Sequence, residues 1–187
     1  GFQGFVFDTE SDSCLNRFDQ ATQLGQYLSV AGLDPNKPPT NWDELVTAAK
    51  ALTKPGQWGF NTHTDTHWYL SAMIMQNGGK TLSDDGKKVV YNSPEGIEAL
   101  QFWGDLVNKH KVMPRHRTFP VSVQDFAAGN TAMLIHSTGN LRFVRDSAKF
   151  EWGTAFLPTR ERQAGAIGGA GSYSFKKAAK AKQQAAS

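Results

Sequence analysis

The stretch over residues 122–157 constrains the fold more than any other part of this sequence. Apolar residues recur at helical spacing after Ser122, which we expect to cap a helix, and Gly129 is placed to end that helix in a left-handed conformation. The apolar run 131–135 is short and bounded by glycine and polar residues, so it fits a buried strand better than a helix. A second helix and a further strand at 152–157 should follow. The pattern predicts an α/β fold.

Polar atoms collect where the 131–135 strand ends. Ser137, Thr138 and Gly139 lie between this strand and the next predicted helix. Open α/β sheets bind small ligands at such strand ends, and helix N-termini favour anionic groups. Simple N-capping would also explain the two hydroxyls, so ligand binding and capping both remain open for this turn.

Composition excludes several classes of protein. The chain has 187 residues, 39% hydrophobic and 20% charged, which suits one sizeable globular domain or two small ones. The net charge of +3 is mild and the basic residues are spread out apart from 115–117 and 176–182, which argues against nucleic-acid binding. The single Cys14 rules out an internal disulfide framework and a multi-cysteine metal site. No apolar run reaches membrane-spanning length, and an export signal, if there is one, is not in this sequence.

The first half of the chain contains one clear helix. Residues 1–26 are hard to interpret, although the apolar run around 5–7 could form an edge strand. A helix should begin after Asn41, with Glu44 reaching back in a capping box, and end at Pro55. A short strand is expected near residues 58–60, and a helix over about 68–76.

A second helix should begin at Ser93, which precedes a proline and an acidic residue in the preferred order. Its predicted buried stripe consists of Ile97, Leu100, Trp103 and Val107. Just before it, residues 83–87 read as a turn between two short extended runs.

The loop over 62–68 is the most polar and aromatic part of the chain. His63, Asp65 and His67 could in principle ligate zinc, but their spacing fits no helical ligand face and no fourth ligand lies nearby. We therefore favour a helix-capping loop or a loop that faces a ligand, with Trp68 as a stacking platform.

Residues 166–175 form an extended, glycine-rich segment. Gly168 and Gly169 would let a ligand or another part of the backbone approach closely, so ligand contact and a tight strand crossing are both open. A phosphate-binding glycine loop is disfavoured because no Walker lysine follows. Residues 176–187 read as the start of an Ala/Lys/Gln helix.

Several pieces of the chain, in this order, resemble bacterial extracellular solute-binding proteins of carbohydrate importers. Within that family the similarity is greatest to glycerol-3-phosphate-binding proteins. The pieces that carry the resemblance are residues 31–35, 38–45, 92–96, 126–133, 137–141, 148–153 and 166–170.

The resemblance implies a fold of two α/β lobes that close over a ligand, of the type II periplasmic-binding-protein kind. This chain is similar to the second lobe, with a mixed sheet flanked by helices. It would be incomplete relative to the two-lobe fold. Residues 1–26 stay unassigned, 27–160 would form the lobe, and 161–187 would form a crossover strand and the start of a helix of the other lobe.

The same resemblance implies a function without catalysis, cofactor or metal. The chain would bind glycerol-3-phosphate, a glycerophosphodiester or a sugar in the cleft between the lobes, and deliver it to the membrane permease of an ATP-driven importer. We expect a periplasmic or extracellular protein, with or without a lipid anchor, and a monomer when complete. The ligand-binding residues expected are Thr66, His67, Trp68, Ser137, Thr138, Gly139, Gly168 and Gly169.

Two alternatives belong to other functional classes. A hydrolase could use Asp65 or His67 with Ser137, but no nucleophile elbow, triad order or carboxylate pair appears in the sequence. The chain could also be an isolated structural lobe with little affinity for a ligand.

Overall fold

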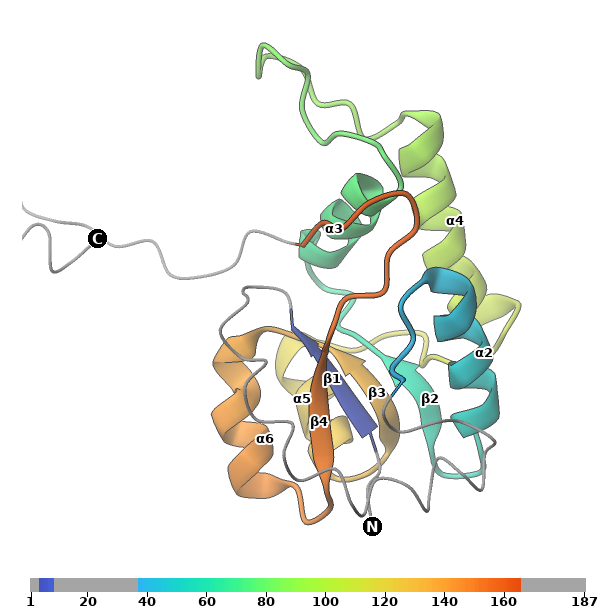
Figure 1. The fold of residues 1–187 in the computed structure, drawn as a ribbon, viewed down its shortest axis with the longest axis vertical. Coiled ribbons are helices and arrows are strands. Elements are labelled where there is room, and N and C mark those ends of the chain that lie inside the picture. The colour runs from blue at the N-terminus through green and yellow to red at the C-terminus, as the bar shows by residue number, and fades with distance from the viewer. Residues whose placement is uncertain (1–3, 9–36, 166–187) are drawn as a thin grey trace, which may run out of the picture.

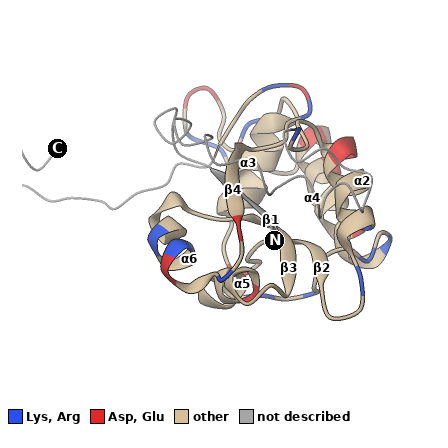
Figure 2. Cartoon of the chain, turned by 60° about the horizontal axis from the view of Figure 1, so that its bottom comes forward, with Lys and Arg blue, Asp and Glu red and all other residues tan. Residues whose placement is uncertain are grey.

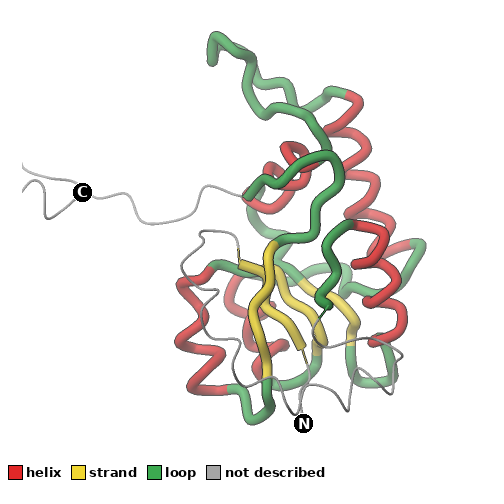
Figure 3. Tube along the Cα trace, in the orientation of Figure 1, coloured by secondary structure: helices red, strands yellow, loops and turns green. Residues whose placement is uncertain are grey.

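The structure is a computed structural model that describes residues 4–8 and 37–165 (Figure 1). The predictions for the remainder of residues 1–26, for Gly168 and Gly169 and for the terminal helix lie outside these ranges. Helices connect the strands along the described part, as predicted for an α/β fold, and they lie around a small sheet (Figure 3).

Four parallel strands form this sheet in the order β2-β3-β1-β4. They are β1 (Gly4–Asp8), β2 (Trp58–Asn61), β3 (Thr131–Ile135) and β4 (Trp152–Phe156). The prediction of an edge strand near residues 5–7 was wrong about its position, because β1 lies between β3 and β4 and pairs with both. All the pairings between these four strands are parallel, whereas the resemblance implied a mixed sheet. Helices carry the chain from β2 to β3 and from β3 to β4, as parallel strands require.

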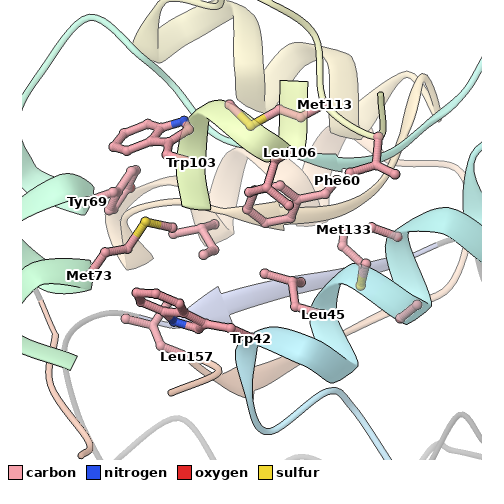
Figure 4. Packing of buried hydrophobic residues seen from close by; sticks show 14 of the residues in the cluster. Trp42, Leu45, Phe60, Tyr69, Met73, Trp103, Leu106, Met113, Met133 and Leu157 are labelled. Atoms are coloured by element: carbon pink, nitrogen blue, oxygen red, sulfur yellow. The ribbon is translucent and has the colours of Figure 1, made fainter. Parts of the chain in front are cut away.

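The strand β3 is buried on both faces of the sheet. Met133 and Ile135 pack into a large apolar cluster with α2 (Trp42–Leu52), α3 (Trp68–Gln76) and α4 (Pro94–Asn108), shown in Figure 4. Leu134 points to the other face, where it meets side chains of α5 (Phe119–Ala127) and α6 (Leu141–Ser147). The continuous apolar run of this strand therefore serves two cores, as expected for a parallel sheet covered on both sides. In Figure 2 the charged residues lie mainly on the helices and loops around the sheet.

The helix α2 begins where the sequence predicted, with a small difference in its cap. The Asn41 side chain accepts a hydrogen bond from the Glu44 amide at 2.9 Å. In a capping box the Glu44 carboxylate would accept from the backbone amide of Asn41. Here it accepts from the amide and hydroxyl of Thr40, one residue before the cap. The hydrogen bonds from Thr40 hold the pKa of Glu44 below its usual value. Against α2, Gly59 of β2 has no room for a side chain, because a Cβ there would lie 1.8 Å from the Ala49 carbonyl oxygen.

The helix α5 begins one turn earlier than predicted. Its N-cap is Thr118, and the predicted cap, Ser122, lies buried inside the helix and donates to the Phe119 carbonyl. Pro120 occupies the first turn, where a missing amide hydrogen does not matter, so it does not stop the helix. The end is as predicted: Gly129 has a φ of 79°, and the amide of Asn130 bonds back to the helix in a Schellman motif.

The helix α4 begins at its predicted cap, Ser93, but it buries a different face from the one predicted. Only Trp103 of the predicted stripe is buried, whereas Ile97 is 61% exposed and Leu100 is 57% exposed. In the first turns of α4 small residues face inward instead, and a Cβ at Gly96 would lie only 1.9 Å from the Tyr91 carbonyl oxygen. The residues of α4 that are buried are Gly96, Ala99, Trp103 and Leu106.

Two connecting segments complete the described fold. Residues 80–91 extend away from the body in Figure 1, and the predicted pair of extended runs is reduced to one isolated bridge between Leu82 and Val89. After β4 the chain returns over α3, where the amides of Glu161 and Arg162 both bond to the Gln76 carbonyl. None of the helices in the described ranges has the length and hydrophobicity needed to cross a membrane.

Candidate functional site

The candidate site lies where the adjacent strands β2 and β3 end. These strands run parallel, with Asn61 beside Leu134, so the segments that follow them leave the sheet at the same edge. The Thr62 hydroxyl donates to the Ile135 carbonyl at 3.2 Å and ties the two strand ends together. The loop at 62–68 and the turn at 136–140 therefore meet, as expected for polar residues at the carboxyl ends of neighbouring parallel strands.

Two buried histidines form the base of this edge. His63 follows β2 and His136 follows β3, and their ring centres lie 5.6 Å apart. Phe119, at the start of α5, contacts both rings, with centroid distances of 5.0 Å to His63 and 4.3 Å to His136. This aromatic group fills the space between loop, turn and helix.

The hydrogen bonds of His136 assign its tautomer. Its Nε2 lies 3.0 Å from the Phe119 carbonyl oxygen, which can only accept, so Nε2 carries the proton. Its Nδ1 then accepts from the side-chain amide of Asn140 at 3.1 Å. Burial disfavours the charged imidazolium and lowers the pKa of His136 to about 4. The ring is therefore neutral at neutral pH.

His63 anchors the loop through a carboxylate. Its Nδ1 lies 2.9 Å from Asp65 Oδ1 and 3.2 Å from the Thr66 hydroxyl. Burial lowers the pKa of His63, and the neighbouring Asp65 offsets part of that effect. Desolvation acts to raise the pKa of Asp65, but hydrogen bonds from the Phe119 amide and from His63 outweigh it, so the net direction is downward.

The turn after β3 holds three of the predicted ligand residues. Ser137 caps a short 3₁₀ helix, η3 (Thr138–Asn140), and its hydroxyl oxygen accepts from the Gly139 amide at 3.2 Å. The capping interpretation is thus confirmed for Ser137. Capping occupies the oxygen of this hydroxyl as an acceptor but leaves its hydrogen available for donation. Ser137 and Thr138 are partly exposed and Gly139 is exposed, so the turn can be reached from solvent.

The exposed end of the 62–68 loop carries an aromatic pair. Trp68, the first residue of α3, is 45% exposed, and the exposed His67 ring stacks on it at 4.9 Å and 23°. No side-chain hydrogen bond from His67 caps α3. The indole is therefore exposed but partly covered by the His67 ring, and its role as a stacking platform stays a prediction.

The Thr66 hydroxyl contacts His63, whose ring contacts His136 at the start of the turn, so Thr66 is linked to the turn. The predicted ligand residues Gly168 and Gly169 lie outside the described residues. In residues 4–8 and 37–165, no three His, Cys, Asp or Glu side chains converge on a potential metal site. Within the same ranges, no hydrogen bond joins Ser137 to Asp65 or His67, as the hydrolase alternative would need.

Phe119 and His136 are the residues that sequence reasoning missed. In the sequence, His136 only marks the polar boundary of the 131–135 run, and Phe119 lies ahead of the predicted cap Ser122 with no predicted role. A histidine directly after a fully apolar strand was the one available signal, because such a position is buried unless the chain turns outward at once.

Comparison with known proteins gives a family. The model of the bacterial extracellular solute-binding protein family matches residues 4–187. The sn-glycerol-3-phosphate-binding periplasmic protein UgpB of Escherichia coli K12 is 27% identical over 167 residues, which cover 83% of this chain and 38% of that protein. The UgpB protein of Yersinia pseudotuberculosis has the same identity and coverage over 171 residues. The chain therefore spans less than half the length of these relatives.

Solved structures agree on the fold. A solute-binding protein of an ABC transporter from Thermotoga lettingae, bound with alpha-D-tagatose, matches with a TM-score of 0.67 and 28% identity over 73% of this chain and 38% of its own. A substrate-binding protein from Listeria monocytogenes in complex with cycloalternan gives 0.62 and 26%, over 73% and 36%. UgpB from Mycobacterium tuberculosis in complex with glycerophosphocholine gives 0.62 and 23%, over 71% and 34%. The described fold is that of one lobe of a type II periplasmic binding protein.

Proposed function

The chain belongs to the bacterial extracellular solute-binding proteins, and from this premise we propose that it forms a lobe of the substrate-binding component of an ATP-driven importer. The ligand is glycerol-3-phosphate, a glycerophosphodiester or a sugar, bound between this lobe and a second one. The observation that carries the proposal is the edge at which the 62–68 loop and the 136–140 turn meet, because exposed polar and aromatic groups follow the buried histidine pair in both segments. The relatives whose names mention glycerol phosphate or sugars support this class of ligand.

The two exposed segments would contact different parts of the ligand. The Ser137 hydroxyl and the backbone around Thr138 and Gly139 suit a phosphate or sugar oxygen, since these groups can donate hydrogen bonds. Trp68 would cover the apolar face of a sugar or glycerol, with Thr66 and His67 beside it. Gly168 and Gly169 complete the proposed ligand-contact set.

Transport would depend on closure of the lobes and needs no chemical step. Contacts that form only when both lobes surround the ligand shift the equilibrium from the open to the closed form, which the membrane permease then recognises. The buried His63 and His136 would keep this edge rigid, because rings packed against Phe119 lose little further freedom on binding. The complete protein would act as a monomer in the periplasm or outside the cell. No cofactor, metal or nucleic acid takes part.

Calorimetry on the full-length protein with glycerol-3-phosphate, glycerophosphocholine and maltose tests the proposal. Binding of one of them should weaken about tenfold in Ser137→Ala, since one hydrogen bond to a charged or polar group is lost. Ser147→Ala, an exposed serine at the end of α6, is the matched control and should bind normally.

Two results would count against the proposal. Absence of heat with all three ligands would leave the isolated structural lobe as the better account. Turnover of a chromogenic phosphodiester or glycoside that disappears in Ser137→Ala would favour the hydrolase instead.

A further inference from the structure

A pocket of about 460 Å³ lies between α4 and the 62–68 loop, and residues of both line it. This volume lies within the range of small-molecule sites. Four of its lining residues are large and apolar, three are polar and uncharged, and the others are a glycine and an arginine. They are Leu70, Leu100, Trp103 and Val107, then Thr64, Thr66 and Asn108, then Gly104 and Arg115.

Among the described residues, the pocket shares only Thr66 with the proposed transport site. The residues of the 137–139 turn do not line it. Trp68 does not line it either. The 62–68 loop thus contributes to two different surfaces.

The open space in the pocket comes from a missing side chain in α4. Leu100, Gly104 and Val107 follow one another at helical spacing along one face of the helix. A Cβ added at Gly104 would have only the Asn108 side-chain nitrogen nearby, at 4.0 Å. A residue of ordinary size would therefore project into the cavity, whose floor is formed by the nearly buried Trp103.

The charged group that lines the pocket is positive. Arg115 is exposed, and within the described ranges its guanidinium makes neither an ion pair nor a hydrogen bond. No lining residue is acidic. The polar neighbours are partly occupied, because Asn108 donates to the Gly104 carbonyl and Thr64 bonds to the Arg117 carbonyl. Arg115 is thus the strongest donor that the pocket can present to a ligand.

We propose that this pocket is a second small-molecule site, which binds organic anions with a compact aromatic or short alkyl body. The body lies on Trp103, Leu100 and Val107, and the anionic group pairs with Arg115. Aromatic and aliphatic walls with one convergent charge are the usual makeup of such sites, and a guanidinium pairs well with a carboxylate, sulfonate or phosphate.

The test uses a fluorescent anion, 8-anilinonaphthalene-1-sulfonate, and its neutral parent, N-phenyl-1-naphthylamine. Titration should show saturable binding of the anion to one site. Gly104→Leu should weaken this binding at least about tenfold by filling the cavity. Gly104→Ala is the matched control: it adds helix propensity in the same place but leaves most of the cavity open, so the anion should still bind. Both variants should unfold at or above the temperature of the parent chain.

Charge recognition is tested at Arg115. Arg115→Gln should weaken the anion about tenfold and leave the neutral compound unchanged. Arg142→Gln removes an exposed arginine from α6 and should change neither. Undiminished binding of the anion to Gly104→Leu, or equal effects of Arg115→Gln on both compounds, would overturn the proposal. Ser137→Ala should leave the dye affinity unchanged, so this result is independent of the transport proposal.

Discussion

At the scale of single residues, the two ends of the 62–68 loop differ in their contacts. His63 is buried against the Phe119 ring, and the exposed Asp65 accepts from the Phe119 amide and contacts the His63 ring, so both fasten the loop to the start of α5. His67 and Trp68, a few residues later, face solvent. One half of the loop is therefore structural and the other half is available to a ligand.

The buried His136 should make the protein sensitive to acid. Its pKa is near 6.5 when unfolded and about 4 when folded, so between these values the unfolded state binds a proton that the folded state does not. The contribution of His136 to the free energy of unfolding should therefore be complete at pH 7, and the free energy should fall by up to about 3 kcal/mol as the pH is lowered towards 4. His63 acts in the same direction, while the lowered pKa of Asp65 adds a loss only at still lower pH. Urea unfolding at a series of pH values measures this.

The variant His136→Gln isolates the contribution of this ring. Its amide can still donate to the Phe119 carbonyl but does not titrate. The slope of the free energy of unfolding against pH between 4 and 6.5 should therefore decrease by the amount that corresponds to about one bound proton. An unchanged slope would show that other groups cause the acid sensitivity.

At the scale of elements, α4 has two apolar faces that the sequence could not rank. One face packs into the core through Ala99, Trp103 and Leu106, and the other, with Ile97 and Leu100, is exposed. The predicted stripe included Ile97 and Leu100, which the structure places on the exposed face. The inward face begins instead with Gly96 and Ala99, and the chain near Tyr91 passes too close to Gly96 for a larger residue.

A pair of identical substitutions in α4 tests this orientation. Leu106→Ala removes a fully buried side chain and should lower the free energy of unfolding by about 2–5 kcal/mol. Leu100→Ala, on the exposed face, should change it by less than about 1 kcal/mol. Chemical denaturation of both variants gives the comparison, and similar losses for the two would contradict the observed rotation of the helix.

At the scale of the whole molecule, the segment after β4 ties the sheet to the helices above its end. Arg162 donates from Nε to the Met75 carbonyl at 2.6 Å and from Nη2 to the Gly79 carbonyl at 3.0 Å. Gln76 receives the Trp42 indole N–H and donates to the Ala164 carbonyl, so α2, α3 and this segment meet at one side chain. These contacts position α3 over the edge that carries the candidate site.

Arg162→Ala should loosen this connection. It removes charge-assisted hydrogen bonds to the Met75 carbonyl in the last turn of α3 and to the Gly79 carbonyl just beyond it, and the free energy of unfolding should drop by about 1–3 kcal/mol. Amide hydrogen exchange at Glu161 should also become faster, since its bond to the Gln76 carbonyl lies beside the lost contacts. Arg160→Ala removes an exposed ion pair with Glu98 and a contact with the Trp42 ring, but no hydrogen bond to the α3 end, so this control should leave the exchange at Glu161 unchanged. Equal exchange rates in the parent and Arg162→Ala would remove this role.

The sequence by itself determined the start of α2 and α4, the glycine end of α5, the buried strand β3 and the membership of a family, because these depend on patterns within a few neighbouring residues. Only the tertiary structure decided that β1 lies inside the sheet, which face of α4 is buried, and that His63 and His136 meet at one edge. Those facts depend on contacts between segments far apart in the chain. No local pattern encodes them, because the same apolar residue stabilises whichever neighbour the fold brings to it.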